Sequence, residues 1–403
     1  MAASFLHGVE ILELDTATHP IKTVRSSVIG LVGTAPDADA AAFPLNTPVL
    51  IAGSEIEAAK LDTVGDKNGT LPDAVDGIFD NAGALIVVVR VDEGADNDAT
   101  ISNIIGGVDG VTGARTGVHT LLNAQSELGV TPKILIAPSF SGHVTRDGSD
   151  VIEGAPVATE LDIVAEKLRG IVIAEGPNTT DADAIAFEAL FGSERVYVVD
   201  PAVKVWDTVA DAPAVESSSA RVAGVFVLND LERGYHVSPS NREIKGIIGT
   251  ARPIDFVLGD ANARANLLNE NNIATIINQD GYRLWGNHTC SSDQKWTFIS
   301  HVRLNDVILE SLLQAHLWAV DRNIDKNYIE QVTEGVNAFL RSLATRGIIS
   351  GGKCWAMPDL NTKESMDAGQ VYFDFDYGRY GTAERVTFRA NVNNDYTVNA
   401  VFG

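Results

Sequence analysis

The segment APSFSGH, residues 137–143, places two serines and a histidine directly after an apolar run. α/β enzymes carry their catalytic groups at such positions, and a nucleophilic serine also needs a neighbouring base and an acid that orients this base. His143 is close in sequence, but the GxSxG pattern of a nucleophile elbow is missing. We therefore interpret the segment as a loop with clustered serines and expect no catalytic residue in it.

A second candidate is the glycine-containing stretch IGLVGTAP, residues 29–36, which follows a strand-like run. Backbone N–H groups at such a turn can hold a phosphate group. The spacing matches neither GxGxxG nor a Walker loop, however, and GK[ST] does not occur in the chain. We expect Gly30 and Gly33 to serve turn formation and close packing, and we expect no cofactor.

Histidines and cysteines in the second half of the chain are the candidate metal ligands: His288, Cys290, His301 and Cys354. The HxC spacing of the first two is not a zinc pattern, and the loop aspartates do not follow the DxDxDG pattern of calcium loops. Ordinary buried thiols and hydrogen-bonded histidines explain these residues better than a metal does. His316 lies on an apolar helical stripe, and we expect a hydrogen-bonded core residue there.

Composition and charge narrow the classes of partner. The chain has 403 residues, of which 54 are acidic and 30 basic, giving a formal net charge of −24. Such a surface repels nucleic acid and anionic lipid. The strongest apolar run, Ala84 to Val89, is far too short to span a bilayer. Two separated cysteines and an N-terminus without a basic stretch predict neither a disulfide scaffold nor a signal peptide, so a reduced intracellular compartment is expected.

The first two thirds of the chain alternate between two patterns. Runs that are apolar on both faces are typical of strands buried in a parallel sheet, and the stretches between them have helical spacing. This alternation predicts an open α/β sheet covered by helices. The predicted strands are 24–33, 83–91, 132–138, 170–177 and 195–201, and the predicted helices are 72–81, 116–128, 157–168, 181–191 and 216–231. Residues 92–115 are interpreted as a loop or small insertion.

After about residue 275 the pattern becomes that of an α+β domain. We expect a first helix capped by Asn305 or Asp306 and a second helix over 327–346, ended by Gly347. The predicted strands of this part are 283–289, 296–304, 370–378, 384–392 and 395–403.

Both ends of the chain are strand-like, at residues 8–14 and at 395–403. A free strand has a row of unpaired N–H and C=O groups, which invites pairing with the sheet of another chain. The alternative is that each end folds back onto its own domain as an edge strand, and the pattern leaves both alternatives open.

The chain resembles the tail sheath proteins of contractile phage tails and R-type pyocins, because a series of its stretches follows the order found in that family. No single piece is a catalytic signature, but the ordered set covers almost the entire chain. The stretches that carry the resemblance are HGVEILELD…HPIKTVRSSVIGLVGTAP (7–36), GALIVVVRV (83–91), KILIAP (133–138), GIVIAEGP (170–177), RVYVVDP (195–201), VLNDLERGYHVSPSNREIKGIIG (227–249), NENNIATIINQDGYRLWGNHT (269–289) and FISHVRLNDVILESLLQAHLWAVDRNID (298–325).

The resemblance implies a fold of α/β plus α+β parts. Its open, mostly parallel sheet is of the type called subtilisin-like, a name that describes the fold only. It further implies an N-terminal arm (1–22), an outer α/β domain (23–275), an inner, tube-facing α+β domain (276–393) and a C-terminal arm strand (394–403).

The resemblance also implies a function without enzymatic activity. Sheath subunits polymerise around an inner tail tube through β-strand exchange of their arms, and the polymer contracts to drive the tube through the envelope of a target cell. The implied partners are further copies of the chain, the inner tail tube protein, and baseplate and tail terminator proteins, with no nucleic acid and no membrane insertion. The expected location is a virion tail that is assembled in the cytoplasm of the bacterial host.

Two sets of residues follow from this model. The inter-subunit arm strands would contribute Val9, Ile11, Leu12, Leu14, Tyr396, Val398, Ala400 and Phe402. The candidate tube-facing charges are Lys326, Glu330, Glu334, Arg341, Arg346 and Lys353. Exposed ion pairs are worth about 0–1 kcal/mol each, which suits a partner that must be released. An ordinary solvated helix face would carry the same charges.

Two other functions remain as alternatives. One is a self-assembling shell protein that never contracts. The other is an α/β enzyme that acts on a small ligand at the strand ends, which the missing nucleophile, metal and phosphate motifs disfavour.

Overall fold

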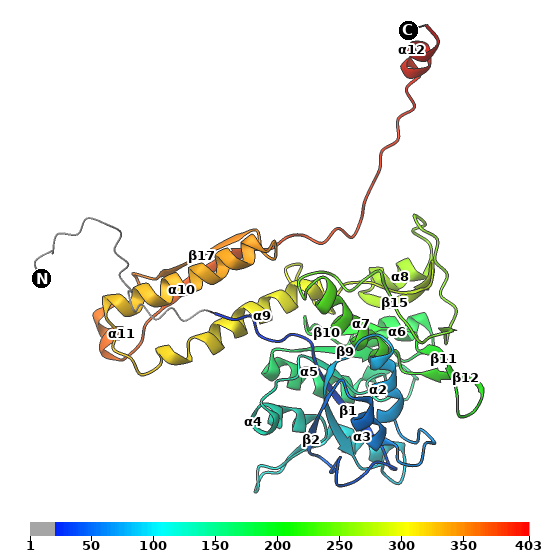
Figure 1. Ribbon diagram of the computed structural model, residues 1–403. Coiled ribbons are helices and arrows are strands. Elements are labelled where there is room, and N and C mark those ends of the chain that lie inside the picture. Colours follow the sequence, from blue (N-terminus) through cyan, green and yellow to red (C-terminus); the bar gives the residue numbers. More distant parts are fainter. Residues whose placement is uncertain (1–20, 403) are drawn as a thin grey trace, which may run out of the picture.

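The computed structural model describes residues 21–402 of the chain. Figure 1 shows a sheet domain with helices on both faces, a helical extension beside it, and a C-terminal segment that leaves the body. The predicted strand 8–14, with Val9, Ile11, Leu12 and Leu14, lies outside the described residues.

The centre of the sheet domain is a nine-stranded sheet in the order β13-β16-β15-β10-β9-β6-β1-β3-β2. Its six central neighbours, from β15 to β3, pair in parallel, whereas β2 at one edge and β16 and β13 at the other are antiparallel. The predicted parallel core is confirmed, within a mixed sheet. The strands are β1 (Val28–Thr34), β2 (Pro48–Ala52), β3 (Leu85–Val91), β6 (Ile134–Ile136), β9 (Ile171–Glu175), β10 (Val196–Val199), β13 (Arg242–Glu243), β15 (Ile273–Asn278) and β16 (Tyr282–Trp285).

Apolar residues on both faces of the central strands build two cores. The side chains on one face pack under α2 and α7, and those on the other face pack under α3, α5, α6 and α8. The glycines of β1 fit this close packing, because a Cβ on Gly30 would lie 2.9 Å from Leu135 and one on Gly33 2.4 Å from Thr70. Gly30 and Gly33 therefore serve packing, as expected.

The helices of this domain follow the predicted pattern with two differences. Residues 92–115 are not only a loop, because they contain α3, whose N-terminus is capped by Asp96, and a small hairpin. The predicted helix 116–128 is a 3₁₀ helix followed by a short α-helix. The helices are α1 (Glu55–Ala58), η1 (Ala59–Leu61), α2 (Leu71–Phe79), α3 (Asn97–Ile105), η2 (Gly117–Asn123), α4 (Ala124–Leu128), α5 (Pro156–Leu168), α6 (Asp181–Glu188), α7 (Ser218–Glu232) and α8 (Arg264–Glu270).

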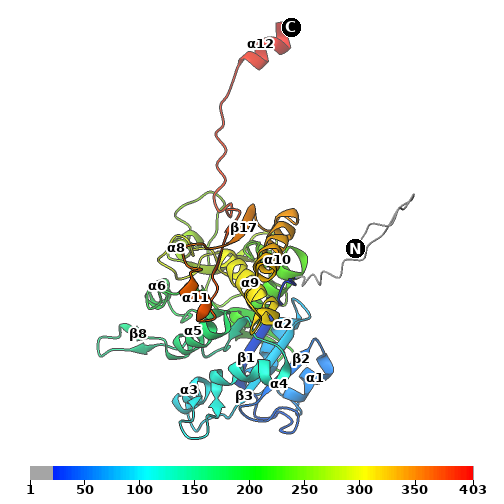
Figure 2. The same cartoon turned by 90° about the vertical axis from the view of Figure 1, so that its left-hand side faces the viewer.

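Three small antiparallel sheets decorate the domain, and Figure 2 shows the hairpin that contains β8 projecting from the body. Their strands are β4 (Gly107–Val108) with β5 (Arg115–Thr116), β7 (Thr145–Arg146) with β8 (Ile152–Gly154), and β11 (Val203–Asp207) with β12 (Ala212–Glu216) and β14 (Gly249–Thr250). The large sheet continues past residue 275 to Trp285 at the end of β16. The predicted domain boundary after residue 275 therefore lies inside β15.

The helical extension corrects one prediction. Residues 296–304 do not form a strand, because α9 already begins at Ile299 and continues past the predicted cap at Asn305 or Asp306. The buried residues Ile299, Val302 and Asp306 recur at helical spacing, and this packing overrides the strand preference of the β-branched side chains. The elements are α9 (Ile299–Ala315), η3 (Leu317–Ala319), α10 (Lys326–Thr345), β17 (Gly351–Ala356), α11 (Lys363–Asp367) and β18 (Phe373–Gly378).

The end of the chain differs from two predictions made from the pattern. Residues 384–392 have no regular structure, and α12 spans Asp395–Phe402, so in the single subunit these residues do not form an edge strand of their own domain. A strand needs a partner for its backbone groups, whereas a helix pairs these groups locally. Among the described residues this segment pairs with no strand, and the helix satisfies its backbone groups locally.

Candidate assembly site

The antiparallel pair β17–β18 is the feature best suited to bind another chain. The two strands pair in register from Gly351↔Gly378 to Ala356↔Phe373, and they pair with no other strand of the described chain. Each strand therefore has an outer edge whose backbone groups face away from the ladder. Such edges are templates for an added strand.

The edge of β17 is partly occupied by a side chain of α10. Asn337 Nδ2 donates to Cys354 O at 3.1 Å, and Cys354 N donates to Asn337 Oδ1 at 2.8 Å. The amide thus satisfies both backbone groups of Cys354, as a neighbouring strand would. Within the described residues no side chain occupies the edge of β18 between Phe373 and Tyr377 in this way, so β18 has the more open edge.

Replacing Asn337 by Ala is expected to destabilise the unassembled subunit by about 1–3 kcal/mol, because both backbone groups of Cys354 would lose their partner. Urea denaturation measures this change. Asn337→Asp keeps the acceptor for Cys354 N but loses the donor for Cys354 O, so it should give a smaller loss. An unchanged free energy of unfolding in Asn337→Ala would show that the amide bonds contribute nothing.

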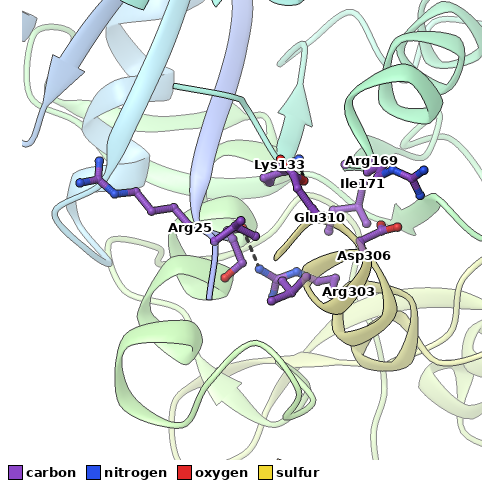
Figure 3. Close-up of a pocket in the computed structure, with 11 residues that line it drawn as sticks. Arg25, Lys133, Arg169, Ile171, Arg303, Asp306 and Glu310 are labelled. Carbon is purple, nitrogen blue, oxygen red and sulfur yellow. Dashed lines mark hydrogen bonds and ion pairs between the residues drawn. The ribbon is translucent and has the colours of Figure 1, made fainter. Parts of the chain in front are cut away.

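Helix α9 joins the helical extension to the sheet domain through buried ion pairs, which we call the α9 seam. Figure 3 shows the three residues that α9 contributes, Arg303, Asp306 and Glu310. Arg195 Nη1 lies 2.7 Å from Asp306 Oδ2, and both side chains are buried. Arg303 Nη1 donates to Asp230 Oδ1 at 2.7 Å. A third pair joins two further residues that Figure 3 shows side by side, Lys133 before β6 and Glu310 of α9.

Burial perturbs the charged groups of the α9 seam. Burial raises the pKa of Asp306, and the Arg195 guanidinium opposes this rise. Burial lowers the pKa of Lys133, and the hydrogen bond to Glu310 opposes this shift. Losing one partner of such a pair leaves the other charge buried and unpaired. We therefore regard α9 and the sheet domain as one rigid unit.

The C-terminal segment, in contrast to the buried α9 seam, is exposed to solvent. Residues 385–394 are exposed, and Phe388 retains 90% of its accessible surface. Of the predicted arm contacts, Tyr396, Ala400 and Phe402 are also exposed on α12, to which Val398 belongs as well. Several large apolar side chains exposed along one segment indicate an interaction site rather than an ordinary solvent-exposed surface.

The serines that the sequence singles out lie at the ends of β6 and β9. Ser139 N donates to Glu175 Oε2 at 3.1 Å, and Glu175 N donates to Ser141 Oγ at 3.2 Å. Among the described residues, no hydrogen bond joins the His143 imidazole to a serine. The geometry of a nucleophile with its base is thus not formed at this position.

Glu175 is nevertheless unusual, because its carboxyl group is buried and accepts hydrogen bonds from the hydroxyls of Ser217 and Ser219. Burial raises its pKa to about 7, although the bonds from Ser219 and Ser139 oppose this rise. A raised pKa means that folding favours the protonated form. Its contribution to stability is complete below the ordinary pKa of about 4.5 and is lost as the pH rises through about 7.

We expect Glu175→Gln to remove this pH dependence. The free energy of unfolding of the native chain should fall relative to that of the variant by up to roughly 3 kcal/mol between pH 4.5 and 8. Comparing urea denaturation of the two unassembled proteins across this range cancels the titration of the other groups. A difference that stays constant with pH would contradict a titrating Glu175.

The candidate metal ligands do not converge, and the residues from 21 to 402 contain no cluster of three His, Cys, Asp or Glu that could hold a metal ion. His288 and His301 flank the ring of Phe298. Cys290 and Cys354 are buried, free thiols. His316 bonds through Nδ1 to Leu312 O at 2.7 Å, as predicted, but its side chain is only half-buried beside the exposed Leu313 and Leu317, so the predicted core position is wrong.

The candidate tube-facing charges are exposed, on α10 and at β17. Two pairs form along the helix: Lys326 Nζ lies 3.6 Å from Glu330 Oε1, and Arg341 Nη2 lies 3.4 Å from Glu334 Oε2. The other two members are Arg346, the C-cap residue of α10, and Lys353 on β17. No helix of the described chain is long and apolar enough to cross a membrane.

Family models match most of the chain in three consecutive parts. Residues 26–91 match the tail sheath protein Gp18 domain III N-terminal region, 113–290 match the phage tail sheath protein central domain, and 291–393 match the phage tail sheath C-terminal domain.

Relatives match over nearly their full length. A putative prophage major tail sheath protein of Pseudomonas aeruginosa (strain UCBPP-PA14) is 43% identical, over 98% of each chain. The tail sheath protein of Escherichia phage P2 is 35% identical, over 99% of this chain and 98% of its own. Both names describe structural sheath proteins, not enzymes.

Two solved structures share the fold at low identity. The PVC sheath complex of an extracellular contractile injection system, in the contracted state, has a TM-score of 0.70 at 18% identity, over 98% of this chain and 100% of its own. The helical sheath of the anti-feeding prophage, also contracted, has a TM-score of 0.70 at 20% identity, over 97% and 100%. By its family models and its relatives, this chain belongs to the family of phage tail sheath proteins, the structural subunits of contractile tails.

Proposed function

We propose that this subunit polymerises around an inner tail tube by exchanging β-strands with its neighbours, and that the polymer contracts to drive the tube through a cell envelope. The observation that carries the proposal is the combination of an open edge on β18 with an apolar C-terminal segment that its own subunit does not cover. A contact between two different surfaces of one chain does not close into a dimer and generates a ring or a helix instead.

In this proposal, residues 395–402 change from helix to strand when they meet the edge of a neighbour. The added strand would gain backbone hydrogen bonds worth about 1 kcal/mol each, and buried apolar side chains add about 1.5–3 kcal/mol each. The edge of β18 is the better acceptor, because Asn337 already occupies part of the β17 edge. Residues 8–14, with Val9, Ile11, Leu12 and Leu14, would supply the second exchanged strand.

The helical extension is proposed to face the tube. The exposed charges of α10 form pairs along the helix, and such pairs can exchange partners at little cost because solvent screens them. The sheet domain would then lie outward. Baseplate and terminator proteins would bind the two ends of the polymer. Assembly would take place in the bacterial cytoplasm.

Electron microscopy of the purified full chain tests the proposal. We expect long cylinders at micromolar protein, with or without tube protein. The net charge of −24 opposes association, so added salt should promote the cylinders. A chain that stays strictly monomeric under all these conditions would contradict the proposal, and discrete closed oligomers would favour the enzyme alternative. A cylinder that never shortens would point to a passive shell.

A further inference from the structure

The C-terminal segment does not leave the body directly at the end of β18. Residues 379–384, which we call the arm root, first lie against the start of α9. Arg379 Nη2 donates to Lys295 O at 2.5 Å, and the Arg379 guanidinium carbon lies 5.3 Å from the centre of the Trp296 ring. The arm root therefore begins with a specific contact to the body.

Two histidines continue this contact. His301 Nε2 hydrogen-bonds Tyr380 O at 3.1 Å. His288 Nε2 lies 2.8 Å from Glu384 Oε1, a close contact without the alignment of a hydrogen bond. The Phe298 ring stands between the two imidazoles, with ring centres 5.3 Å from His288 and 5.2 Å from His301, and both contacts are edge-on. The two imidazoles, both packed against Phe298, thus lie next to the arm root.

We propose that these contacts form a latch that holds the arm root on the body and opens when an attached neighbour moves. The inference rests on the proposed strand exchange, because an arm bound at its far end is what would pull on the root. Contacts of partly exposed groups such as Glu384 are individually weak. The latch can therefore open while the buried α9 seam stays closed.

Opening the latch changes the reach of the arm. With the latch closed, the ten residues 385–394 connect the body to the strand-forming segment and span about 35 Å when fully extended. An open latch frees the six residues 379–384 and adds about 20 Å. The latch thus gives the connection between two subunits a short and a long form.

Trypsin cleavage of the unassembled subunit tests the closed latch. A protease needs several residues in extended form on both sides of the bond, so cleavage after Arg385, next to Glu384, requires an open latch. Arg389 lies farther along the exposed segment and is the internal control. We expect cleavage after Arg389 to be about tenfold faster than after Arg385, because cleavage tracks the open population. The two rates should become similar in His288→Ala/Glu384→Ala, in which Glu384 is an exposed position whose loss leaves the fold intact.

Equal rates at the two sites in the native chain, or a ratio that the double substitution does not change, would overturn the latch. Both cleavage measurements use unassembled protein, so their outcome does not depend on strand exchange. The strand-exchange proposal is contradicted by a different result, namely that the full chain forms no cylinders. A second experiment tests whether the latch opens during contraction. Sheaths of His288→Ala/Glu384→Ala should assemble, and electron microscopy should show that they contract at a lower urea concentration than native sheaths. An unchanged urea threshold would show that the latch does not open during contraction.

Discussion

Removal of residues 394–403 will leave a folded subunit that no longer polymerises. Tyr396, Val401 and Phe402 are exposed, so their loss removes no core contact from the subunit. In the polymer the same residues would lose strand pairing and apolar burial worth at least ~5 kcal/mol per contact. This loss raises the concentration needed for assembly by roughly three to four powers of ten.

The measurement combines circular dichroism, which should be nearly unchanged, with electron microscopy, which should show no cylinders. Ala400→Pro is a finer test, because proline removes a ladder donor while the rest of the arm stays intact. Ala400→Ser is its matched control and should assemble. Deleting residues 1–18 should likewise prevent polymerisation. Normal cylinders from both deletions would show that the arms do not hold the polymer together.

Asp306→Ala is expected to cost the subunit about 3–5 kcal/mol of stability, the largest effect of a single substitution that we predict. The substitution leaves the Arg195 guanidinium buried at the α9 seam without its buried partner, since the remaining carboxylate, Glu166, is largely exposed. Urea denaturation of the unassembled protein measures this loss.

The double variant Arg195→Met/Asp306→Leu is the matched control for this pair. Apolar side chains of similar volume remove both charges together, so most of the stability should return. A loss below about 1 kcal/mol in Asp306→Ala would contradict a rigid α9 seam, because a rigid joint cannot solvate the unpaired arginine.

The central sheet could be predicted from the sequence, because its strands are buried on both faces and their apolar runs are continuous. Val87 and Val89 face one core while Ile86 and Val88 face the other, and few folds other than a covered parallel sheet accommodate such a run. Helix α10 was equally predictable from its apolar stripe. Residues 296–304 were not, because a short apolar run fits a strand and a buried helix alike.

The candidate site was harder to predict, because it depends on contacts between distant parts of the chain. Asp306 looks like a helix cap in sequence, and only the fold brings it to Arg195. Asn337 is a polar residue on a helix, with no pattern to signal its bonds to Cys354. For His288 and His301 the sequence favoured ordinary hydrogen-bonded histidines over metal ligands, but it gave no sign that they contact residues 379–384, which only the fold brings to them. The terminal segment has strand propensity, but its residues 395–402 pair with no strand of the described chain, and the structure shows them as a helix.

Cryo-electron microscopy of the polymer formed by the full chain tests strand exchange most directly. We predict that residues 395–402 of each subunit form a strand hydrogen-bonded along the outer edge of β18 of a different subunit. Density that shows these residues still helical, or folded back onto their own subunit, would contradict it.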